Sequence, residues 1–166
     1  MLQITTIGDP VLRERAVEIG AEELSSARVQ ELIDDLIETM RSAGGAGLAA
    51  PQVSVTKRVA VVEVDNNVRY PYKPPIPLTV MVNPVIEPLS PETLVINEGC
   101  LSVPDLRGDL ERFVDVCVRF LDRHGAPQEL VARGLTAGTF QHEVDHLDGV
   151  LFLDRVRDPT TFSTWE

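Results

Sequence analysis

The chain lacks the features that would direct it into a membrane or out of the cell. Its 166 residues contain no apolar run of about eighteen or more, the length that a membrane-spanning helix needs. Residues 1–4 begin neither a basic and then apolar secretory signal nor an Arg- and Ser-rich leader. We therefore expect a cytoplasmic protein that has no membrane partner.

The chain is also poor in cysteine and in basic residues. Its two cysteines, Cys100 and Cys117, are too few for a disulfide framework. Cys117 stands in a β-branched run that favours packing in a core, whereas Cys100 stands beside a glycine in a predicted turn. The 15 basic residues are outnumbered by 26 acidic ones, and the net charge is −11. A nucleic-acid binder needs clustered basic residues, so we expect neither general nucleic-acid binding nor direct nucleic-acid specificity.

The rest of the composition is that of a globular protein, with 43% hydrophobic and 25% charged residues. At this length, and without an internal repeat, we expect one domain over residues 1–166. Apolar residues at three- and four-residue steps predict an N-terminal amphipathic helix over residues 22–43. We expect an α+β fold with short, mostly antiparallel strands around a central second helix. Prolines and turns separate the strand candidates, which are residues 57–64, 79–83, 94–97, 114–121 and 128–132.

The second helix is predicted over residues 134–147, and it carries the pattern His-Glu-x-x-His. His142 and His146 lie four residues apart on one face, about 6 Å along the axis, so both imidazoles can reach one metal ion. Glu143 would project near the open coordination position as a general base. A solvated turn of helix is the alternative, but the same face carries small and apolar residues. We therefore predict that the histidines face a partly buried cleft.

Two histidines need a third protein ligand, and the sequence offers three choices. A metzincin-like site would have a histidine six residues after His146, where this chain has Phe152. A thermolysin-like site would use a glutamate about twenty residues on, and Glu166 stands there without a second long helix to hold it. The third choice is an upstream cysteine, Cys100, in the segment EGCLS at residues 98–102.

Four segments, in this order, resemble the peptide deformylase family: GDPVLR at residues 8–13, GAGLAAPQ at 45–52, EGCLS at 98–102 and QHEVDH at 141–146. The match runs from about residue 4 to residue 156, and the motifs in register are very specific. The resemblance implies a metal-dependent hydrolase that removes the formyl group, as formate, from the N-terminal formyl-methionine of nascent polypeptides. The alternative is an HExxH metalloprotease, which would cleave internal amides.

The resemblance implies a role for each motif. Ferrous iron, or zinc, nickel or cobalt in its place, would have three ligands: Cys100, His142 and His146. Metal-bound water would attack the formyl carbon, with Glu143 as general base and then general acid. The oxyanion would accept hydrogen bonds from the Gln52 side-chain amide and the Leu101 backbone N–H.

The resemblance also implies a substrate site, where an extended peptide would pair with backbone near residues 45–47. An apolar pocket would hold the methionine side chain, but Ala46, Gly138 and Thr139 are smaller or more polar than such a pocket predicts. Either the mouth of this pocket is wider, or a bulkier residue elsewhere fills the space that these small residues leave. We further expect N-formylmethionyl peptides and transient ribosome association as partners. The implied substrate-binding residues are Gly45, Ala46, Gly47, Ile96, Gly99, Leu135, Gly138, Thr139 and Arg107, with His142 beside them.

Overall fold

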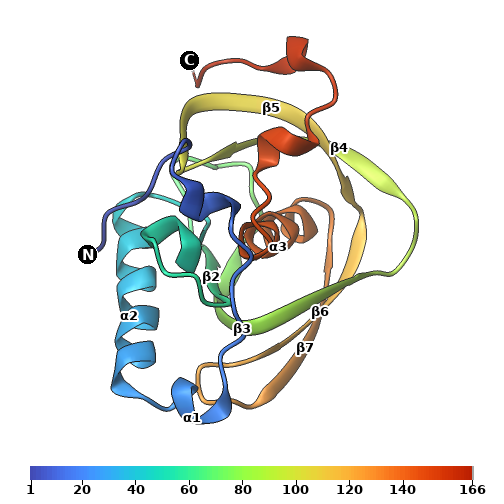
Figure 1. Cartoon of the computed structure of the whole chain (residues 1–166). Coiled ribbons are helices and arrows are strands. Elements are labelled where there is room, and N and C mark those ends of the chain that lie inside the picture. The colour runs from blue at the N-terminus through green and yellow to red at the C-terminus, as the bar shows by residue number, and fades with distance from the viewer. Residues whose placement is uncertain (166) are drawn as a thin grey trace.

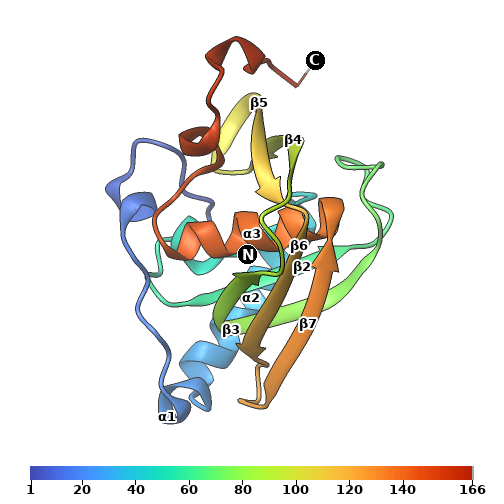
Figure 2. The same ribbon diagram turned by 90° about the vertical axis from the view of Figure 1, so that its right-hand side faces the viewer.

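In a computed structural model, which describes residues 1–165, two antiparallel sheets surround one helix (Figure 1). The smaller sheet pairs β4 (Thr93–Cys100) with β5 (Val103–Phe113). The helix, α3 (Gly134–Leu147), lies between the two sheets in both views (Figures 1 and 2). The predicted mixture of few helices and antiparallel strands is thus confirmed. The larger sheet has the order β1 (Gly47–Ala49), β2 (Val59–Val64), β3 (Ile76–Pro88), β6 (Asp115–Leu121) and β7 (Pro127–Arg133).

The N-terminal helical region is divided in two, so the prediction of one helix over residues 22–43 is wrong at its start. A single turn, α1 (Ala21–Leu24), precedes the long helix α2 (Ala27–Ser42). Ser26 separates them, because its hydroxyl accepts a hydrogen bond from the backbone N–H of Val29 at 3.3 Å and caps α2. No helix within residues 1–165 is both long and apolar enough to cross a bilayer.

Three strands, β3, β4 and β7, are longer than the sequence predicts, whereas β2 and β6 begin two residues and one residue later than predicted. β3 continues through Pro84, which was expected to end it, because the register shifts between Val82 and Val85. Proline is tolerated at such a bulge, where no ladder hydrogen bond is lost. β5 was not predicted, because charged residues interrupt its apolar pattern and it forms through pairing with β4. The turn expected around Cys100 is shorter, since Cys100 is the last residue of β4 and pairs with Val103.

Strand β2 separates two parts of the core. Its side chains alternate, so Val59 and Val61 face α2 while Ala60 and Val62 face α3. On the α3 side, Phe140 is 2% exposed and packs in the same cluster as residues of β6. One side of α3, the helix that carries the histidines, is therefore packed against the core, and the histidines lie on the side that is free to form a site.

The segment after α3 packs on the smaller sheet. Phe152 is buried in a third apolar cluster with Leu110 and Cys100, at the start of the 3₁₀ turn η3 (Phe152–Arg155). After the turn η4 (Pro159–Thr161), Ser163 and Arg107 exchange backbone hydrogen bonds of 2.8 and 2.9 Å. Glu166, the glutamate considered as a third metal ligand, lies outside the described residues.

Candidate metal centre and substrate cavity

Cys100, His142 and His146 come together although 42 residues of chain separate the first two. The sulfur of Cys100, at the end of β4, lies 3.3 Å from His146 Nε2, and the two imidazole rings on α3 have centroids 5.0 Å apart. One ligand atom from each residue lies within 4.8 Å of the other two, the single such cluster found within residues 1–165. Cys117 is buried on β6, and His124 is exposed in the turn after that strand.

The donor set fits a metal ion. Burial holds the pKa of His146 well below its usual value, so its imidazole is neutral, the form that binds metals. His142 donates from Nδ1 to the carboxylate of Glu98, 2.8 Å away, which leaves Nε2 directed at the cluster. A thiol sulfur and two ring nitrogens are ligands that zinc, iron, nickel and cobalt all accept.

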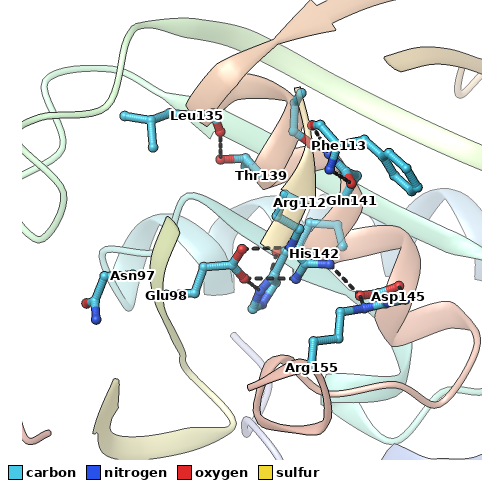
Figure 3. A network of polar contacts seen from close by, with 12 residues as sticks. Asn97, Glu98, Arg112, Phe113, Leu135, Thr139, Gln141, His142, Asp145 and Arg155 are labelled. Carbon is cyan, nitrogen blue, oxygen red and sulfur yellow. Dashed lines mark hydrogen bonds and ion pairs between the residues drawn. The ribbon is translucent and has the colours of Figure 1, made fainter. Parts of the chain in front are cut away.

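A buried ionic network orients His142 from behind (Figure 3). Arg112 on β5 donates two hydrogen bonds to Glu98, at 2.7 and 2.9 Å, and a third of 2.6 Å to Asp145. Arg155 also reaches Asp145, with bonds of 2.7 and 2.9 Å. Glu98 thereby connects the buried guanidinium of Arg112 to the imidazole of His142. Such an outer partner fixes the orientation of a histidine that binds a metal.

The network keeps Glu98 ionised inside the protein. Burial alone would raise its pKa, but hydrogen bonds from Arg112 and His142 lower the pKa to about 2. For Arg112, burial opposes the charge, and the two carboxylates more than offset this, so its pKa is raised. The side chain of Arg112 is 2% exposed, and its two carboxylate partners make it a brace behind the site.

Glu143 is enclosed next to the two histidines. It is 3% exposed, and its Oε2 has no hydrogen-bond partner within the described residues. Burial raises its pKa to about 7, although His142 and Lys73 oppose that rise. A Cβ on Gly47 would lie 2.5 Å from Glu143 Oε1, so the glycine lets β1 pass directly beside the carboxylate.

Gln52 lies on the far side of Cys100. Its carbonyl oxygen accepts from the backbone N–H of Ala49 at 3.0 Å, which fixes the orientation of the amide. The amide nitrogen then points to Ser102 Oγ at 3.0 Å and to the Cys100 sulfur at 3.6 Å. Leu101 follows Cys100 and lines the same cavity. The amide N–H of Gln52 is thus directed at the Cys100 sulfur, one member of the cluster of three candidate metal ligands.

One cavity gathers nearly all the residues that the sequence singled out. Only His146, the third member of the Cys100–His142–His146 cluster, and Arg107 are outside its lining. Sequence reasoning missed four lining residues, which lie outside the quoted motifs. It also assigned no role to Glu98, although this residue begins the EGCLS segment. The predicted residues in the lining are Gly45, Ala46, Gly47, Gln52, Ile96, Gly99, Cys100, Leu101, Leu135, Gly138, Thr139, His142 and Glu143; those missed are Tyr70, Tyr72, Lys73 and Asn97.

Bulkier neighbours border two small residues of the expected pocket. A Cβ on Gly138 would lie 2.7 Å from Ile96 Cδ1, so the side chain of Ile96 already occupies that space. Thr139 contacts Lys73, whose amine lies 2.8 Å from the threonine hydroxyl. Ile96 and Lys73 therefore lie against the small residues Gly138 and Thr139.

Arg107 stands beside the cavity wall and not in it. It donates hydrogen bonds of 2.7 Å to Asn97 Oδ1 and to the hydroxyl of Tyr72, both of them lining residues. Its guanidinium lies 4.0 Å from the ring centroid of Trp165, and that of Arg69 lies 4.1 Å from it. Trp165 packs on Gly99, where a Cβ would lie 2.5 Å from the indole.

Hydrolysis of an amide needs an activated water, a base and donors for the oxyanion. Residue types suited to each task line one cavity beside a cluster fit for a metal ion. The fold and this site define the class of the protein as a metal-dependent hydrolase.

Comparison with known proteins narrows the class. The sequence model of the polypeptide deformylase family matches residues 1–162. A peptide deformylase of Leptospira biflexa is 41% identical, with 96% of this chain and 90% of the relative covered. One from Xylella fastidiosa is 46% identical, with 93% and 86% covered. A class I type b peptide deformylase from Acinetobacter baumannii, bound to Met-Ala-Ser, superposes with a TM-score of 0.89 at 43% identity, covering 94% of this chain and 98% of that one.

The chain belongs to the polypeptide deformylase family. Metal-dependent deformylation is the function of this family, so the chain is an enzyme, a hydrolase that acts on formylated peptides. Membership decides between the two activities that the HExxH pattern left open, in favour of deformylation over internal proteolysis.

Proposed function

We propose that Cys100, His142 and His146 hold the metal ion and that Glu143 works beside them as general base and general acid. The observation that supports this most strongly is the convergence of one thiol and two imidazoles, with a buried carboxylate on the same helix. A divalent ion at such a site lowers the pKa of water toward neutrality and polarises a carbonyl oxygen.

Glu143 moves the proton in this proposal. It takes a proton from the water whose oxygen bonds to the formyl carbon, and it gives that proton to the amine nitrogen as the carbon–nitrogen bond breaks. The products are formate and a peptide with an unblocked N-terminus. A pKa of about 7 suits a group that must both accept and release a proton near neutral pH. The unpartnered Oε2 supports its part as the accepting atom.

Gln52 and Leu101 are the proposed oxyanion donors. The orientation of the Gln52 amide by Ala49 supports this role, because a preorganised donor needs no rearrangement as negative charge develops. The backbone N–H of Leu101 directly follows Cys100 and would donate from the same wall. Loss of one such donor lowers kcat by roughly 10²-fold or more.

We propose ferrous iron as the working metal, with zinc, nickel or cobalt able to occupy the same ligands. Ligand softness supports this group of ions without selecting among them, since a single thiolate with two imidazoles suits all four. The choice of iron rests on the family resemblance of the three motifs.

The proposed substrate is an N-formylmethionyl peptide. The related enzyme from Acinetobacter baumannii binds Met-Ala-Ser, the product that such a substrate would leave. The peptide would lie as an added strand along β1, near Gly45 and Gly47, with Gly99 across the cleft. Its first side chain would enter a pocket formed by Ala46, Ile96, Leu135, Gly138 and Thr139, and Arg107 would brace the outer wall.

We also propose that residues 1–166 form one catalytic domain, which acts in the cytoplasm on nascent chains and associates transiently with the ribosome. Contacts of α3 with strands of both sheets support the single domain. Newly made polypeptides are the source of formylated N-termini, which supports a site of action beside translation.

The decisive experiment measures formate release from formyl-Met-Ala-Ser by the metal-loaded enzyme. Replacing Glu143 by alanine should lower kcat about 10²- to 10⁴-fold, because the base is lost. Glu92→Ala, which removes an exposed carboxylate, is the matched control and should leave kcat unchanged. Equal turnover by the Glu143→Ala variant would remove Glu143 from the mechanism. Cleavage of internal peptide bonds without formate release would contradict the whole assignment.

A further inference from the structure

The cavity contains a lysine for which the proposed reaction has no use. Lys73 belongs to the connection between β2 and β3, residues 65–75. Asn67 fixes this connection to the cavity rim, since its amide donates to the carbonyls of Gly44 and Gly45 at 3.1 and 3.3 Å. Tyr70, which is 7% exposed, holds it in the main core cluster. Lys73 is thus directed into the cavity by a well-anchored segment.

The amine of Lys73 ends inside the proposed pocket for the first side chain. Its Nζ donates to Thr139 Oγ1 at 2.8 Å, and it lies 4.9 Å from the ring centroid of Tyr70. Lys73 lines the same cavity as Leu135 and Gly138. A methionine side chain that enters this pocket therefore meets a hydrogen-bond donor there, the amine of Lys73.

Thr139 does not satisfy that amine by itself. Its hydroxyl donates to the carbonyl of Leu135 at 3.2 Å, so its oxygen accepts from Lys73. This is the one hydrogen bond that the Lys73 amine makes within residues 1–165, whereas an ammonium has three N–H donors. Burial lowers the pKa of Lys73, and the charges of Glu98 and Glu143 oppose that change. Lys73 is half-buried, and a bound side chain that covers its amine would leave the remaining N–H donors unpaired unless that side chain offers an acceptor.

We propose, on the basis of the proposed function, that Lys73 is a specificity-determining residue. Its amine makes the pocket that holds methionine favour a first side chain that ends in a hydrogen-bond acceptor oxygen over a purely aliphatic one of the same length. Methionine sulfoxide and glutamine have the length of methionine and carry such an oxygen near the end. A thioether accepts hydrogen bonds weakly, and norleucine does not accept them at all. A norleucine side chain would therefore cover the amine of Lys73, displace any water bound to it, and offer no hydrogen-bond acceptor in place of that water.

The size of the effect follows from the kind of bond. Gaining or losing a hydrogen bond to a charged donor changes the dissociation constant by roughly 10- to 100-fold. Specificity of this sort is large when a site's buried polar group would be left unpaired by the wrong substrate. We expect kcat/KM for formyl-Gln-Ala-Ser and for the methionine sulfoxide peptide to exceed that for formyl-norleucine-Ala-Ser by about 10-fold or more.

The test compares those three peptides, with formyl-Met-Ala-Ser alongside, on the metal-loaded enzyme. Lys73→Met keeps the length of the side chain but removes the donor, and it should lower the acceptor-to-norleucine ratio at least about 10-fold. Lys73→Arg, which keeps a donor, should retain a ratio above that of Lys73→Met. Arg69→Met is the matched control, because Arg69 is in the same connection but stacks on Trp165 outside the cavity lining. It should leave the ratio unchanged.

Three results would overturn this inference. An unchanged ratio in Lys73→Met would show that the amine does not select the side chain, and an equal rise in kcat/KM for all peptides would show that Lys73 only obstructs the pocket. Absence of formate release from every peptide by the unmodified enzyme would refute the proposed function and this inference with it. Calorimetry with the deformylated peptides Gln-Ala-Ser and norleucine-Ala-Ser gives the corresponding ratio of dissociation constants without turnover. A variant that turns over slowly can therefore still be tested.

Discussion

Replacing Arg112 by methionine should destabilise the protein by about 3 kcal/mol. The side chain is 2% exposed, and its loss would leave the carboxylate of Glu98 buried without its main partner. Removal of one member of a buried pair typically costs about 3–5 kcal/mol. The pKa of Glu98 gives a consistent figure: burial alone would raise it, yet its hydrogen bonds hold it at about 2 instead of 4.5, which corresponds to roughly 3 kcal/mol.

Urea denaturation at matched metal content measures this loss. Because the pKa of Glu98 is lower in the folded state, the stabilisation is present above about pH 4.5 and is lost as the pH falls toward 2. The difference between the variant and the unmodified protein should therefore be largest near neutral pH and shrink near pH 3. Arg119→Met, which removes an exposed arginine paired with Glu87 and Glu129, should cost under about 1 kcal/mol. Equal stability of Arg112→Met and the unmodified protein at pH 7 would refute the reasoning.

Two further predictions concern the site itself. Gly47→Ala should lower kcat about 10-fold or more, because its Cβ would displace the carboxylate of Glu143, whereas Gly20→Ala, with no atom near its Cβ, should not. Equal kcat in both variants would mean that Glu143 tolerates the shift. An anaerobic preparation should contain one iron per chain by metal analysis and lose activity in air. Cys100→Ala should lose the metal and Cys117→Ala should keep it; iron retained without Cys100 would contradict the ligand set.

The chemistry of the site was largely accessible from the sequence because each motif is local. His142, Glu143 and His146 lie within one turn and a half of a helix, so their common face follows from helical geometry. The GAGLAAPQ segment, which the sequence analysis quotes for the family resemblance, contains β1 and most of η2 (Ala50–Val53). The long amphipathic stripe of α2 was equally clear, although the break at Ser26 was not.

The missed features depend on contacts between distant segments. β5 exists through its pairing with β4, and Arg112 is buried because Glu98 and Asp145 reach it from β4 and α3. Lys73 resembles any surface lysine in a proline-rich connection until the fold brings it to Thr139, 66 residues away. No local pattern distinguishes such residues from solvated ones.

What the sequence by itself determined is the family, and with it the class of reaction; it also indicated the groups that we propose to react, because periodicity and short motifs record neighbours within a few residues of each other. Only the tertiary structure decided which charges are buried, which side chains lie against Gly138 and Thr139, and that Lys73 lines the same cavity. The physical reason is that burial and pairing depend on how distant segments pack together, and packing is a property of the whole fold.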